Sequence, residues 1–180
     1  MQFLQHAPGR DGVSSVPIKI ALMSIGDAAR WQRQIQPYAQ EAGAPDRNWN
    51  WPYMRRWLPL TEMALGRRAP ALTVWTRGAN DAPVPVAMIL LAEGHSALND
   101  HAKQSVFLWF MAAAPEAALR EYGVRVLPKL GRVLIDIAVT HSHNCGYAGR
   151  IGATPAASLG LGCSRSDAAG RPEPFHARCA

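Results

Sequence analysis

The sequence predicts a single-domain α/β protein, with a mixed sheet that is flanked by helices on both faces, and three observations predict it. Three short apolar runs bounded by turn residues follow one another at residues 71–76, 84–92 and 106–112, as successive strands do. The last two runs are apolar at consecutive positions, which is typical of strands covered on both sides. An amphipathic helix then follows, with apolar residues at helical spacing (Leu130, Val133, Leu134, Ile137 and Ala138).

Length and composition indicate one folded domain with two loose ends. The chain has 180 residues, of which 48% are hydrophobic and 18% charged, so it is far from the composition of a disordered protein. A domain of this size buries roughly 70% of the surface that its unfolded chain exposes. We assign residues 17–155 to the domain. Residues 1–16, with Gly9, Asp11 and Gly12, are predicted to be a flexible leader, and residues 156–180, rich in Gly, Ser, Pro and Arg, a weakly ordered tail.

The elements before the three runs are predicted from caps and prolines. Residues 18–23 are predicted to be a strand, and Ser24 with Asp27 then has the spacing of a helix N-cap pair. We expect Pro37 to kink or end that helix. Pro52 suits the first turn of a second helix, which should reach about residue 65 and be bent or broken at Pro59. After the amphipathic helix, residues 142–146 are predicted to form a turn and residues 147–153 a short strand.

Charge and cysteine usage limit the partners and the compartment. The net charge is +6, but Arg and Lys occur singly or in pairs and never in runs of five, so nucleic acid is not the expected partner. A cofactor rich in phosphate would suit the same charge. No apolar stretch reaches the roughly 18 residues that span a bilayer, and no secretory signal is present, which predicts a cytoplasmic protein without a membrane partner. The odd number of cysteines predicts reduced thiols, and a homodimer is left open.

Three segments carry a resemblance to a known family. VFLWFMAAAP (106–115), KLGRVLIDIAV (129–139) and NCGYAGRIGATP (144–155) resemble the central strand, the pyrophosphate-binding helix and the following strand of the GNAT family of N-acetyltransferases. The resemblance covers about residues 15–155. It implies a GNAT-like central sheet and the transfer of an acetyl group from acetyl-CoA, the cosubstrate, to an amine of a small molecule or peptide. It also implies that acetyl-CoA lies between two splayed strands, with its pyrophosphate at a helix N-terminus.

The resemblance also implies site residues. Phe110, Met111 and Ala112 are expected to offer a strand edge to the cofactor, and the segment before and at the helix is expected to bind its phosphates (Val126, Lys129, Leu130, Gly131 and Arg132). Acetyl transfer needs a group that takes a proton from the amine. No acid occurs in residues 106–114, so Glu93 and His95, at the end of the preceding strand, are the nearest catalytic candidates.

The chain departs from the family pattern at two places. The family's phosphate loop has Arg or Gln, two residues, Gly, one residue, then Gly or Ala, whereas this chain has Val126, Lys129 and Gly131 at those three positions. No tyrosine follows Tyr147, although a later helix of the family often carries one that protonates the thiolate. A diverged or C-terminally incomplete member would have such a sequence. Catalytic impairment therefore stays open, as does a non-enzymatic interaction module that uses the tryptophan-rich segment 49–57.

A metal site is the remaining alternative. His141, His143 and Cys145 are clustered, and His176 and Cys179 could complete a set of zinc ligands. The paired knuckles of structural zinc sites are absent, so no metal is expected. The chain also has no GxSxG elbow, no P-loop and no GxGxxG after a strand, which leaves hydrolase and NTPase functions without a motif.

Overall fold

The structure is a computed structural model that describes residues 3–6, 16–98, 100–124 and 130–153. The predicted tail and the candidate residues Val126 and Lys129 lie outside the described residues. The elements in chain order are β1 (Phe3–His6), β2 (Pro17–Leu22), α1 (Ile25–Gln34), α2 (Gln36–Glu41), α3 (Trp51–Leu65), β3 (Ala71–Arg77), a 3-10 turn (Ala79–Asp81), β4 (Pro83–Ala97), β5 (Asp100–Ala113), α4 (Glu116–Glu121), α5 (Leu130–Asn144) and β6 (Ile151–Ala153).

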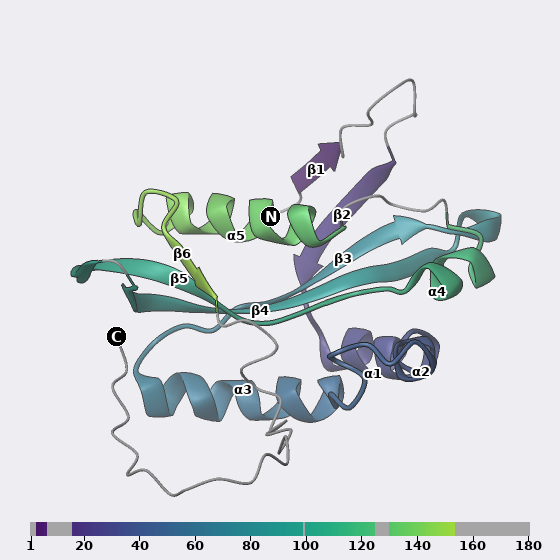
Figure 1. The fold of residues 1–180 in the computed structure, drawn as a ribbon, viewed down its shortest axis with the longest axis horizontal. Coiled ribbons are helices and arrows are strands. Elements are labelled where there is room, and N and C mark those ends of the chain that lie inside the picture. Colours follow the sequence, from purple (N-terminus) through teal and green to yellow (C-terminus); the bar gives the residue numbers. More distant parts are fainter. Residues whose placement is uncertain (1–2, 7–15, 99, 125–129, 154–180) are drawn as a thin grey trace, which may run out of the picture.

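The six strands form one mixed sheet in the order of the chain, β1-β2-β3-β4-β5-β6. Neighbours from β1 to β5 are antiparallel, and β5 and β6 are parallel. A parallel pair needs a crossover, and α5 supplies it. Figure 1 shows α1, α2 and α3 on one face of the sheet and α5 on the other. The predicted fold class, a mixed sheet with helices on both faces, is therefore confirmed.

The ends of α1, α2 and α3 agree with their local sequence, whereas α5 continues to Asn144, into the turn predicted at 142–146. Ser24 and Asp27 form a reciprocal capping box, with the Asp27 N–H donating to Ser24 Oγ at 3.0 Å. Pro37 lies in the first turn of α2, and Ile35 separates α1 from α2. Pro52 likewise lies in the first turn of α3. α3 is not broken at Pro59, because the helix continues past this exposed proline to Leu65 and ends at Gly66 in the left-handed conformation, while a bend there stays a prediction.

The predicted strands are confirmed, but two are longer than their apolar runs. β4 continues to Ala97 and β5 begins at Asp100, so polar residues extend the hairpin that the two strands form. The sequence did not predict α4 or β1. β1 lies inside the segment assigned to the flexible leader and pairs with β2. β6 covers only the last part of the strand predicted at 147–153, because Gly146 and Gly149 adopt positive φ in the turn before it.

The core joins the helical layer to β5 through a chain of aromatic rings. Trp31 of α1 and Trp51 of α3 are fully buried and meet edge to face, with ring centroids 6.3 Å apart. Trp49 contacts Trp51 at 5.8 Å and Phe110 of β5 at 4.9 Å. Each such pair adds about 0.5–1.5 kcal/mol to the burial of the rings. The tryptophan-rich segment is thus divided, because Trp51 belongs to the core while Trp57 is 48% exposed.

Candidate functional site

β5 contains a bulge in its apolar half. Leu91 of β4 is paired with Leu108, and the residue before it in β4, Leu90, is paired with Phe110. Trp109 is therefore an extra residue without an opposite partner, which bends the strand and increases its twist. Its ring stacks on that of Phe110 at a centroid distance of 5.6 Å. The bulge at Trp109 directly follows Leu108, the last residue of β5 that pairs with β6.

The register fixes which backbone groups of β5 face away from β4. The N–H of Ala114 donates to the carbonyl of Val86 at 2.8 Å, so the backbone of Ala114 faces β4. In an antiparallel pair this orientation alternates along the strand. The backbone groups of Ala112 and Phe110 therefore face β4 too, while those of Met111 and Ala113 face the opposite edge.

β6 occupies only the first part of that opposite edge. It pairs with β5 from Val106 to Leu108, and the Val106 N–H donates to the Arg150 carbonyl at 3.0 Å. Among the residues that the structure describes, no strand pairs with β5 beyond Leu108 on this side. The N–H and C=O groups of Met111 and Ala113 are thus presented to an incoming chain of amides. Of the three edge residues predicted from the sequence, Met111 has this orientation, whereas Phe110 and Ala112 do not.

The N-terminus of α5 is the second part of this region. The first N–H groups of a helix have no partner within the helix, and its dipole favours an anion there. A Cβ built at Gly131 meets no heavy atom of the described residues within 4 Å, and Arg132 is exposed beside it. Leu130 differs, because its side chain is buried in the core and only its backbone is available. Residues 125–129 lie outside the described residues, so of the predicted phosphate-binding set the structure places Leu130, Gly131 and Arg132 at the start of α5.

The two catalytic candidates lie together at the far end of β4 but have different surroundings. The Nδ1 atom of His95 lies 3.0 Å from the carbonyl oxygen of Ser96, and its ring stacks on Phe107. Because a carbonyl can only accept, a neutral His95 donates from Nδ1 and keeps a lone pair on Nε2. Glu93 instead pairs with His141 of α5, with Oε1 and Nε2 separated by 2.9 Å.

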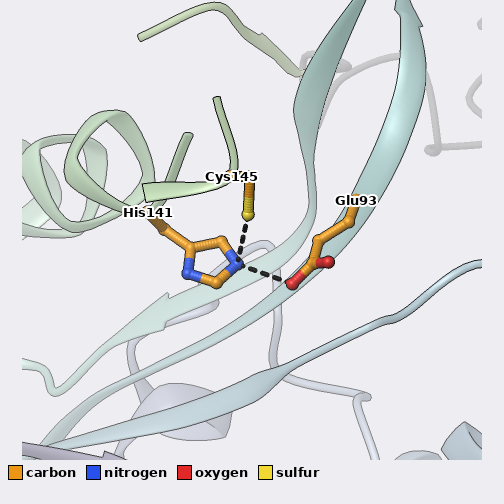
Figure 2. A group of neighbouring side chains, drawn as sticks. All are labelled: Glu93, His141 and Cys145. Carbon is orange, nitrogen blue, oxygen red and sulfur yellow. Dashed lines mark hydrogen bonds and ion pairs between the residues drawn. The ribbon is translucent and has the colours of Figure 1, made fainter. Parts of the chain in front are cut away.

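Cys145 completes a cluster with Glu93 and His141, which Figure 2 shows. The Cys145 Sγ atom lies 3.6 Å from the Nε2 atom of His141, the same nitrogen that faces Glu93. A nucleophilic triad would need the carboxylate at one ring nitrogen and the thiol at the other. Burial, and then the charge of Glu93, raise the pKa of the Cys145 thiol. Cys145 therefore lacks the environment of an activated nucleophile.

This cluster was only half visible in the sequence. His141 and Cys145 are four residues apart at the end of a helix, a spacing that the sequence shows. Glu93 comes from β4, 48 residues earlier, and only the packing of α5 on the sheet brings it to them. His143, the third clustered residue of the predicted metal set, is exposed and lies outside this group, and His176 and Cys179 lie outside the described residues.

Comparisons with known proteins give one distant structural likeness. No family model matches the chain, and no curated protein matches it. A crystal structure of ribosomal-protein-alanine N-acetyltransferase from Brucella melitensis biovar Abortus 2308 is similar at a TM-score of 0.47 and 13% sequence identity, over 91% of this chain and 99% of that one.

Proposed function

We propose that this protein binds acetyl-CoA and transfers its acetyl group to an amine. The observation that carries the proposal is the edge of β5 beyond Leu108, where Met111 and Ala113 present backbone groups next to the crossover to α5. An extended chain of amides is bound at such an edge by strand-like hydrogen bonds. The pantetheine arm of coenzyme A is a chain of this kind, and its pyrophosphate is the anion that the start of α5 would attract.

The residues of this chain would divide the work as follows. Met111 and Ala113 pair with the pantetheine amides, and the first N–H groups of α5, with Arg132, hold the pyrophosphate. Acetyl-CoA supplies the thioester. The proton of the amine needs a base, and we propose His95 from the chemistry of its ring, because its Nε2 keeps a lone pair while Glu93 is already paired with His141; its partner on β5 is Ser105, before the stretch that pairs with β6. Direct action of Glu93 as the base stays a prediction from the sequence.

The first test is the thermal unfolding of the full chain with and without acetyl-CoA. A ligand at about 100 times its dissociation constant stabilises the folded state by roughly 2.7 kcal/mol. We therefore expect Tm to rise by several degrees with millimolar acetyl-CoA or coenzyme A, and to stay unchanged with acetate or adenine. The His95→Gln variant should keep this rise in Tm and lose acetyl transfer in a screen of amine acceptors.

The same test separates the second candidate function, an interaction module. Tyr53 and Trp57 are exposed on one face of α3 and their rings lie 5.8 Å apart, which is the observation that favours it. Exposed apolar groups that lie together mark surfaces that bind other macromolecules. A well-folded sample whose Tm does not respond to acetyl-CoA would contradict the acetyltransferase proposal and favour the interaction module.

As for membranes, none of the helices in the described ranges combines the length and the apolar character that a bilayer crossing needs.

A further inference from the structure

The cluster of Glu93, His141 and Cys145 is not needed for the proposed binding of acetyl-CoA. Each residue offers one ligand atom, a carboxylate oxygen, an imidazole nitrogen and a thiol sulfur, and the three atoms lie within 4.8 Å of one another. They come from two rigid elements, since Glu93 is on β4 and His141 is near the end of α5, with Cys145 directly after it. The Glu93 and His141 side chains are only 12% and 26% exposed.

The three ligand atoms converge on one point, which is the arrangement that a shared central atom needs. Both Glu93 and Cys145 approach the same atom, Nε2 of His141, at 2.9 and 3.6 Å. The Nε2 atom carries either one N–H or one lone pair, and the Cys145 thiol also hydrogen-bonds to Glu93, so the three polar groups are in mutual contact. Figure 2 shows the three ligand atoms turned toward one another. A cation between them would satisfy all three groups at once.

We propose that Glu93, His141 and Cys145 form a three-ligand site for a divalent transition metal, with zinc as the best match. Zinc takes carboxylate, imidazole and thiolate ligands at roughly 2.0 to 2.3 Å in a tetrahedral arrangement, which places neighbouring ligand atoms about 3.3 to 3.6 Å apart. The distances in the cluster differ from these values by a few tenths of an ångström at the two contacts with His141. A fourth position is left for water or another ligand, as in sites that are open to chemistry.

The charges of the site also suit a dication. The Glu93 carboxylate and a Cys145 thiolate together neutralise a charge of two, and His141 binds as the neutral ring. The thiol gives up its proton to solvent when the metal–sulfur bond forms. Imidazole and thiolate ligands favour zinc over magnesium or calcium, which prefer oxygen. The charge of Arg68 lowers the pKa of the Cys145 thiol, but by less than burial and the charge of Glu93 raise it.

The test is metal binding by the metal-free full chain, with Co²⁺ as a spectroscopic probe and Zn²⁺ in titration calorimetry. Cys163→Ser, Cys179→Ser and His176→Ala are introduced together, so that no cysteine or histidine of residues 154–180 binds the probe. In this background we expect one equivalent of Zn²⁺ and a thiolate-to-cobalt charge-transfer band. Loss of a residue that hydrogen-bonds to a metal ligand typically lowers the metal affinity by about 10 to 100-fold, so loss of a ligand itself should lower it by more than about 100-fold.

Three variants and one control decide the outcome. Cys145→Ser should abolish the charge-transfer band, and His141→Ala and the near-isosteric Glu93→Gln should each weaken binding by more than about 100-fold. His143→Ala, an exposed histidine on the same helix end, should bind as the parent does. If His141→Ala does not fold, as judged by circular dichroism without metal, Glu93→Gln and Cys145→Ser still give the answer. No binding by the parent, or binding that Glu93→Gln and Cys145→Ser leave unchanged, would overturn the proposal. This result is independent of whether acetyl-CoA binds.

Discussion

Replacing Trp31 with alanine is expected to lower the free energy of unfolding by about 3–5 kcal/mol, the cost of removing a fully buried aromatic side chain. The change removes the edge-to-face contact with Trp51. It also removes the hydrogen bond, 3.0 Å long, in which Trp31 Nε1 donates to Oε1 of Gln36. Gln36 is itself buried, so its oxygen would be left without that donor. Urea unfolding followed by circular dichroism measures the difference.

Trp57→Ala is the matched control for this substitution. The residue type is the same, and the side chain lies on α3, but it is 48% exposed and its contact is with another exposed ring, that of Tyr53. We expect a change within about 1 kcal/mol, since exposed positions away from special contacts alter stability little. Equal losses for the two variants would contradict the assignment of Trp31 to the core that joins the helical layer to β5.

Two adjacent proline substitutions in β5 are expected to differ in their effect on the stability of the fold. Ala112 is 3% exposed and faces β4 with its backbone, so Ala112→Pro removes an N–H that points at the Met88 carbonyl. We expect a loss of stability of at least about 2 kcal/mol, because the ladder is interrupted and a buried acceptor is left unpaired. Met111 is 43% exposed, and its N–H faces away from β4. Met111→Pro should therefore keep the fold, as prolines on a free strand edge do.

The binding of acetyl-CoA, in contrast, is expected to be impaired in the variant that keeps the fold. Met111→Pro removes an N–H that we assign to the pantetheine arm, so the rise in Tm with acetyl-CoA should be reduced or lost in this folded variant. Thermal unfolding of both variants with and without acetyl-CoA measures the two effects together. If Met111→Pro unfolds as readily as Ala112→Pro, the register derived for this half of β5 is wrong. If it folds and responds fully to acetyl-CoA, its N–H does not contact the ligand.

The sequence predicts the apolar parts of this fold well and its polar parts poorly, for a physical reason. The strands at 71–76, 84–92 and 106–112 have buried side chains, and burial selects the residues that make a strand visible. Glu93 to Ser96 and His101 to Gln104 extend the same hairpin through hydrogen bonds of the backbone, which leave little trace in the side chains. β1 is likewise defined by its pairing with β2, and pairing partners cannot be read from a single segment.

The candidate site shows the same limit more sharply. Phe110, Met111 and Ala112 form an unbroken apolar run, so nothing in their sequence tells which of them faces an open edge. That depends on the bulge at Trp109 and on the register with β4, and both are consequences of the assembled sheet. The helical spacing of His141 and Cys145 was visible, but Glu93 joins them only through the packing of α5. Residues that share an element were predicted together, and residues that share a site were not.

The most direct measurement is amide hydrogen exchange resolved at single residues of β5, in the free protein and with saturating acetyl-CoA. The N–H groups of Met111 and Ala113 have no strand partner within the described residues, so they should exchange faster in the free protein than those of Phe110 and Ala112. Acetyl-CoA should slow exchange at Met111 and Ala113 and at the first residues of α5. Exchange at these amides that is already slow, or that acetyl-CoA leaves unchanged, would contradict the account of β5 as the edge that binds the cofactor.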